Sequence, residues 1–173
     1  MIVRSLKLQG IRSWEDGETK FSEGFTAIVG PKGAGKSSLI DGIEFALFGD
    51  KAFPEYRAII REGSSSSEVE LNVAYRGKNY YIRRGLTRTQ DGITQDPSRL
   101  SIALEDTIYT RNKATDLDRD VKTFLNIDKN LLENTCLTKQ EELKSLLNIG
   151  PRDRKRVIDE LLQLDAFESA WQG

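Results

Sequence analysis

Residues 30–37 constrain this chain more than any other segment. Their sequence, GPKGAGKS, fits the pattern G-x-x-x-x-G-K-[ST] of the phosphate-binding P-loop. The apolar run at residues 25–29 predicts a buried strand before the loop, and the apolar spacing after it predicts a helix from residue 36 to residue 48. This order directs backbone N–H groups and the positive end of a helix at a polyphosphate. The segment therefore predicts a nucleotide-binding site.

Each residue type in the loop suits one task. Gly33 and Gly35 let the backbone approach phosphate oxygens where a Cβ would collide. Lys36 can reach the β and γ phosphates as a point charge, and the Ser37 hydroxyl is a hard oxygen ligand for Mg²⁺. A glycine turn that precedes a helix by chance is the alternative, but the pattern arises by chance in about one chain in two hundred of this length.

The composition excludes several classes of function. The 173 residues suffice for one domain with a sizeable core, and the net charge of -1 provides no overall basic field. Any contact with nucleic acid must therefore use local patches. The chain has no histidine, which excludes His-dependent mechanisms within it, and its one cysteine, Cys136, excludes an intrachain disulfide. No apolar run approaches transmembrane length, so no membrane partner is expected.

The remaining chain predicts an opening hairpin, an antiparallel β meander and a helical C-terminal part. We therefore expect an α/β (α+β) fold with a mixed sheet around the P-loop helix. The expected strands are residues 2–9, 19–21, 68–75, 80–86, 100–104 and 107–110, with a helical turn at 56–60 and a long loop at 87–98. The expected later helices are residues 116–125, 127–134 and 141–147, and another from 151 onward.

A P-loop is only half of a hydrolytic site, because an acidic residue at the end of an apolar strand must hold Mg²⁺ and polarise the attacking water. The nearest match, Asp159, follows basic residues within a helical pattern, and we reject it. Gln140 is the best second nucleotide-site residue, since its amide could ligate Mg²⁺ through oxygen and orient water through nitrogen. A solvent-facing glutamine at a helix start is the ordinary alternative.

These features resemble the N-terminal half of an SMC-like ATPase head, and most of all the Rad-type double-strand-break repair ATPases that work with a repair nuclease. The resemblance is carried by the opening strand followed by Ile-Arg-Ser at 11–13, the apolar run at 25–29, and the P-loop followed by Ser-Leu-Ile-Asp. Two later segments add to it: KQEE at 139–142 and LLQLDAFE at 161–168, where the family's coiled coil begins.

The resemblance implies an ABC-type head built from both ends of one long chain. Residues 1–165 would be its N-terminal lobe and residues 166–173 the start of the coiled coil. The complementary C-terminal half would supply the signature motif, the acidic residues and a switch histidine, so this chain alone would be inactive as an ATPase. Two heads would form a homodimer around ATP and Mg²⁺, with double-stranded DNA and the nuclease as further partners. The location would be cytoplasmic at the nucleoid, or nuclear in a eukaryote.

The resemblance also assigns site residues. Lys36 and Gln140 would be catalytic, and Ser37 and Gln140 would hold the metal ion. The family often has Asn where this chain has Lys32, which adds charge near the γ-phosphate. Arg61 and Glu62 would lie near the adenine. The implied nucleotide contacts are Arg12, Lys32, Gly33, Ala34, Gly35, Lys36, Ser37, Ser38, Arg61, Glu62 and Gln140.

Two basic clusters are the predicted DNA contacts, since backbone binding without sequence preference needs only a local patch. A solvated sheet face is the alternative for the first cluster, because Glu68 and Glu70 dilute it. The polar face of a helix is the favoured interpretation of the second. The first comprises Arg76, Lys78, Arg83, Arg84 and Arg88, with Arg111 and Lys113 nearby, and the second Arg152, Arg154, Lys155 and Arg156.

Two other functions remain open at the level of the sequence. One is a stand-alone P-loop nucleotide kinase, which needs an acidic base and arginines that close over a second substrate. The meander after the P-loop helix argues against it. The other is a nucleotide-binding regulatory module without chemistry of its own.

Overall fold

The computed structural model describes residues 1–127, 129, 132 and 150. The chain divides into two compact units, Met1–Asn126 and Ile127–Gly173. All strands and helices named below lie in the first unit. The helices predicted at 127–134, at 141–147 and from 151 onward lie wholly or largely outside the described residues, as does the predicted start of a coiled coil.

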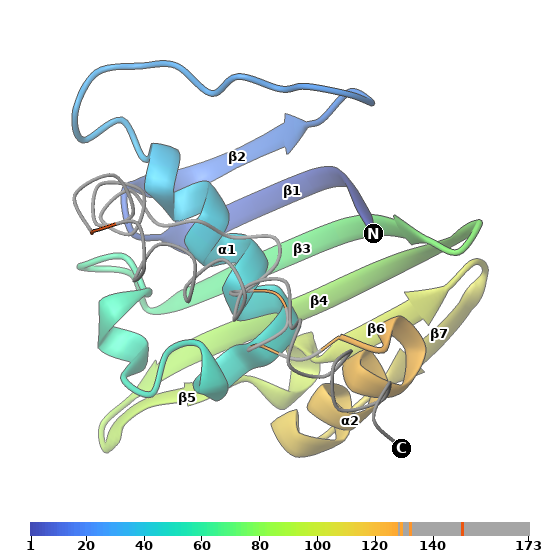
Figure 1. Cartoon of the computed structure of the whole chain (residues 1–173). Helices are drawn as coiled ribbons and strands as arrows, with labels where there is room; N and C mark the ends of the chain where they lie inside the picture. Colours follow the sequence, from blue (N-terminus) through green and yellow to red (C-terminus); the bar gives the residue numbers. More distant parts are fainter. Residues whose placement is uncertain (128, 130–131, 133–149, 151–173) are drawn as a thin grey trace. The chain divides into compact units, whose positions relative to one another are not determined.

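The strands form one antiparallel sheet rather than a mixed sheet beside a separate meander. Its order is β2-β1-β3-β4-β6-β7, and β5 pairs with β4 outside this path. The pairing of β1 with β3 joins the opening hairpin to the later meander, and all strand pairs among the described residues are antiparallel (Figure 1). The strands are β1 Ile2–Ile11, β2 Trp14–Lys20, β3 Ser66–Tyr75, β4 Lys78–Thr89, β5 Gly92–Gln95, β6 Ser101–Leu104 and β7 Thr107–Thr110.

The helix that follows the P-loop, α1 Lys36–Phe48, lies across one face of this sheet (Figure 1). Leu6 and Leu8 of β1 are fully buried on this face, whereas the intervening Lys7 is exposed. The helix packs closely, because a Cβ on Gly42 would lie 2.5 Å from Leu8 Cδ2. The predicted P-loop helix is therefore confirmed, and its packing fixes the P-loop relative to the sheet.

The second helix, α2 Ala114–Leu125, buries one apolar stripe and contacts β6 and α1. The stripe consists of Leu117, Val121 and Leu125, at the spacing expected of an amphipathic helix. Three short 3-10 turns complete the elements: η1 Gly49–Lys51, η2 Tyr56–Ala58 and η3 Pro97–Arg99. Within the part of the chain that the structure describes, no helix combines the length and apolar character required to cross a membrane.

The buried strand predicted at residues 25–29 is wrong. These residues form no strand, and Phe25 and Val29 are 93% and 87% exposed. A strand needs a neighbour that satisfies its backbone N–H and C=O groups. No strand among residues 1–127 pairs with this segment. The apolar run therefore lies uncovered immediately before the P-loop.

Two strand boundaries also differ from the prediction. The second strand begins at Trp14 rather than at residue 19, because its pairing with β1 starts at the Ile11–Trp14 pair. The segment predicted as a long loop at 87–98 contains the end of β4 and the short strand β5, which returns alongside it.

Candidate nucleotide-binding site

The P-loop has the backbone geometry of an anion cradle. Gly33 and Gly35 have φ of 85° and 82°, a left-handed conformation that residues with a Cβ rarely adopt. Gly35 is the N-cap residue of α1, and no side chain caps this end of the helix. Within residues 1–127, no acceptor receives a hydrogen bond from the N–H groups of residues 33 and 35–37. These donors and the positive helix end are therefore available to a phosphate.

The ammonium of Lys36 lies inside the loop. Its Nζ donates to the backbone oxygens of Gly30 and Pro31, at 2.8 and 2.6 Å. Lys32 and Ala34 are exposed on the same loop. A phosphate bound at the helix start would compete with these carbonyl oxygens for the ammonium, because charge-assisted bonds to phosphate are the stronger ones.

The turn between β1 and β2 supports the end of the P-loop. Trp14 Nε1 donates to the backbone oxygen of Gly35 at 3.0 Å, and the Oγ atoms of Ser13 and Ser38 lie 3.5 Å apart. A Cβ on Gly35 would lie 2.5 Å from both Ser13 Oγ and Trp14 Nε1, so only glycine fits there. Trp14 was not among the predicted site residues. The signal that could have identified Trp14 is its position, because it directly follows Arg12 and Ser13 in the turn after the first strand.

Replacing Trp14 by phenylalanine is expected to weaken Mg-ATP binding by about two- to tenfold, because one hydrogen bond to the P-loop is lost while most of the ring remains. Calorimetric titration measures the affinity, and thermal denaturation reports the fold. A variant that melts earlier but binds ATP as tightly as the wild type would show that Trp14 supports only the fold.

The structure brings Arg12 and Arg61 together beside α1. The backbone of Arg12 has φ of 46°, and its guanidinium lies 3.1 Å from Asp41 of α1. Arg61 Nη1 donates to the backbone oxygen of Arg12 at 3.2 Å, and the N–H of Arg12 donates to Ile59 at 2.9 Å. The loop after η2 thus holds the turn that carries Arg12. Contact of either guanidinium with a nucleotide remains a prediction.

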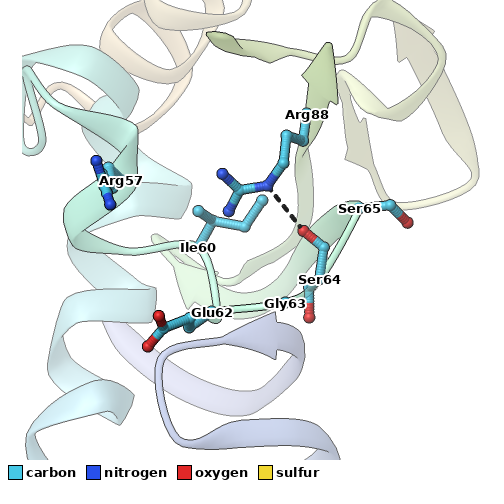
Figure 2. A pocket seen from close by; sticks show the side chains of 7 residues that line it. All are labelled: Arg57, Ile60, Glu62, Gly63, Ser64, Ser65 and Arg88. Carbon is cyan, nitrogen blue, oxygen red and sulfur yellow. Dashed lines mark hydrogen bonds between the residues drawn. The ribbon is translucent and has the colours of Figure 1, made fainter. Parts of the chain in front are cut away.

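A cavity of about 500 Å³ lies beside this loop (Figure 2). Glu62 and Gly63 form part of its wall, together with Arg57 of η2 and Arg88 of β4. No residue of the P-loop lines it. The predicted position of Glu62 near an adenine therefore remains untested, and the cavity is a feature separate from the P-loop.

Arg84 cannot contact DNA, and its inclusion in the basic patch is wrong. Its side chain is 0% exposed because it lies on the inward face of β4, between the buried residues Ile82 and Leu86. It pairs with Asp118 of α2 at 2.8 Å and donates to Gln95 Oε1 at 2.8 Å. Burial lowers the pKa of the Arg84 guanidinium, and the neighbouring Asp118 carboxylate opposes that change.

Two other residues of the predicted patch are held in ion pairs. Arg83 pairs with Glu68 at 2.7 Å, and Arg111 pairs with Asp120 at 2.6 Å. The hydrogen bond to Glu68 raises the pKa of Arg83. Burial acts to raise the pKa of Glu68, but the bond from Arg83 helps to lower it overall. The positive charges of Arg83 and Arg111 are therefore largely neutralised by these carboxylates.

The remaining basic residues do not form one patch. Arg76 and Lys78 lie at the turn between β3 and β4, whereas Arg88 lies at the opposite end of these strands. Lys113 is exposed just before α2. The predicted sites that lie outside the described residues are Gln140, Arg152, Arg154, Lys155 and Arg156.

The model of a family described as an AAA domain matches residues 5–172. The chain belongs to this family. It is 35% identical to the DNA double-strand break repair Rad50 ATPase of Thermoplasma volcanium, over 99% of this chain and 19% of that protein. It is 32% identical to the Rad50 ATPase of Methanocaldococcus jannaschii, over 99% of this chain and 16% of that protein. The resemblance to the Rad-type ATPase head is thus confirmed, and the chain spans about a fifth of the length of these curated relatives.

A solved structure supports the fold class. The recombination mediator protein RecF in complex with ATP aligns with a TM-score of 0.55 and 16% identity, over 91% of this chain and 37% of that chain. At this identity the likeness concerns the fold alone. The predicted α/β fold class is therefore confirmed.

Proposed function

We propose that this chain is the ATP-binding N-terminal half of a DNA double-strand-break repair ATPase head. The observation that carries the proposal is the P-loop, whose N–H groups at the start of α1 have no acceptor among residues 1–127 and are free to bind phosphates. Similarity to Rad50 ATPases along nearly the whole chain supports the class of reaction.

The residues of the loop fit ATP with Mg²⁺. Lys36 would leave the carbonyl oxygens of Gly30 and Pro31 and pair with phosphate oxygens. The exposed Ser37 hydroxyl would hold Mg²⁺, which commonly keeps several waters and takes substrate phosphates as further ligands. No group of three His, Cys, Asp or Glu side chains among the described residues is arranged to hold a metal ion. When bound, Mg²⁺ neutralises charge on the phosphates.

Two observations support a complementary C-terminal half as partner. The apolar segment 25–29 is exposed and pairs with no strand among residues 1–127, so a further strand or surface is needed to cover it. The sequence also provides no acidic residue suited to activating water. We also propose that ATP brings two such heads together as a homodimer. This assembly would bind DNA in the cytoplasm and regulate a nuclease. Gln140 would contact Mg²⁺ and the attacking water in that assembly.

Phosphate release from ATP tests the proposal. The chain alone is expected to show little turnover, and adding the complementary half should produce ATPase activity that depends on both components. Vigorous hydrolysis by the chain alone would contradict the proposal. Phosphotransfer to an acceptor without the second half would indicate a kinase, and ATP binding without any gain in turnover would indicate a regulatory module.

A further inference from the structure

The cavity beside the loop after η2 carries two guanidinium groups from distant parts of the sequence (Figure 2). Arg57 belongs to η2 and Arg88 to the end of β4, and both side chains are exposed. Ile60, which is only 5% exposed, lies between them as an apolar part of the wall. The fold therefore places two cations at one opening.

The backbone and the side chain of Arg88 are both anchored. Its N–H donates to the backbone oxygen of Ser65 at 2.8 Å, and its Nε donates to the backbone oxygen of Ser64 at 3.2 Å. Figure 2 shows the two Nη nitrogens on the side of the guanidinium that faces away from Ser64. An arginine fixed through Nε presents its remaining N–H groups in the fork that matches a phosphate.

Neither cation is neutralised by a carboxylate. Among the described residues, no ion pair involves Arg57 or Arg88, whereas Arg83, Arg84 and Arg111 each pair with an acid. Glu62 is the one acidic residue of the wall among the residues that the structure describes, and Figure 2 shows its carboxylate pointing away from the Arg88 guanidinium. The described part of the wall therefore has a net charge of +1, counted from two arginines and one glutamate.

The rest of the wall suits a backbone phosphate better than a whole nucleotide. Ser64 and Ser65 contribute hydroxyl groups, and the space around Gly63 is open, with no atom within 4 Å of the position of a Cβ. Among the described residues, no aromatic side chain lines the cavity, so none of them offers a stacking surface for a base. Contacts to phosphate without base contacts are the mark of binding that is independent of sequence.

We propose that this cavity binds a phosphate of the DNA backbone through Arg57 and Arg88. This inference rests on the proposed function, which includes DNA binding, and it assigns that binding to a different place from the outer face of β4. The bound group is a phosphodiester, held by the Arg88 Nη groups, the Arg57 guanidinium and the serine hydroxyls.

The double variant Arg57→Gln/Arg88→Gln tests the proposal in the full chain. Anisotropy of a dye-labelled duplex of random sequence, measured over a range of KCl concentrations, should show about tenfold weaker binding. The slope of log K against log salt should fall in magnitude by about one for the lost phosphate contact. Mg-ATP affinity should not change. The control Lys20→Gln/Lys122→Gln removes two exposed charges from β2 and α2, and thermal denaturation checks the fold of both variants.

Equal losses of duplex binding in the variant and the control would overturn the proposal, because net charge alone would explain them. Weaker ATP binding with unchanged duplex binding would assign the cavity to a nucleotide phosphate instead and would also overturn it. If the wild-type chain binds no duplex, the DNA-binding part of the proposed function fails. The cavity is then judged by inorganic pyrophosphate in a Lys36→Met background: a thermal shift that disappears with Arg57→Gln/Arg88→Gln supports a phosphate site there, and an unchanged shift rejects it.

Discussion

Replacing Lys36 by methionine is expected to lower the affinity for Mg-ATP at least about a hundredfold. The ammonium is the one side-chain cation held within the P-loop, between the backbone oxygens of Gly30 and Pro31. Two charge-assisted hydrogen bonds to phosphate oxygens would be lost, each contributing about 1.5–3 kcal/mol, and about 1.4 kcal/mol corresponds to a tenfold change in affinity. Calorimetric titration with Mg-ATP measures the loss.

The matched control is Lys51→Met, which removes the same charge from the exposed turn η1 beyond the far end of α1. It should leave the affinity within about twofold of the wild type, since exposed charges at a distance are screened by salt. Equal affinities of Lys36→Met and the wild type would remove the P-loop as the nucleotide site.

Replacing Arg84 by methionine is expected to lower the free energy of unfolding by about 3–5 kcal/mol. The fully buried guanidinium connects three elements, since it pairs with Asp118 of α2, donates to Gln95 of β5 and lies 3.3 Å from the backbone oxygen of Ala46 in α1. Without it, the Asp118 carboxylate, whose side chain is only 11% exposed, loses its partner. Urea denaturation followed by circular dichroism measures the change.

Two controls separate this effect from the loss of any arginine. Arg83→Met removes the adjacent residue, whose half-exposed ion pair with Glu68 should contribute at most about 1 kcal/mol. The double variant Arg84→Met/Asp118→Leu should recover much of the lost stability, because no buried charge is then left unpaired. A single Arg84→Met variant as stable as Arg83→Met would show that the buried pair contributes little.

The alternation of side chains could have identified the role of Arg84 from the sequence. Tyr80, Ile82 and Leu86 alternate on one face of the predicted strand, and Arg84 continues that series. A cation on the inward face predicts a buried partner rather than a DNA contact. The partner itself could not be predicted, because Asp118 follows in a helix whose packing against the strand depends on the complete fold.

The P-loop helix and the meander followed from local patterns, since helical and strand periods are properties of short segments. The first part of β2 did not, because Glu15, Asp16 and Glu18 interrupt any apolar alternation before the predicted strand at 19–21. The pairing with β1 determines where this strand begins. The apolar run at 25–29 is the opposite case, because its local pattern predicts a strand that the structure does not contain. Hydrophobicity indicates that a segment is to be covered, but it does not identify what covers it.

The contact between Trp14 and the backbone oxygen of Gly35 gives this site an intrinsic optical probe. Indole emission responds to the polarity and hydrogen bonding around the ring, and this ring touches the residue at which the P-loop becomes a helix. With Trp171 replaced by phenylalanine, Trp14 would be the only indole in the chain. Its spectrum would then follow the closing of the loop around phosphates in real time, without an attached dye.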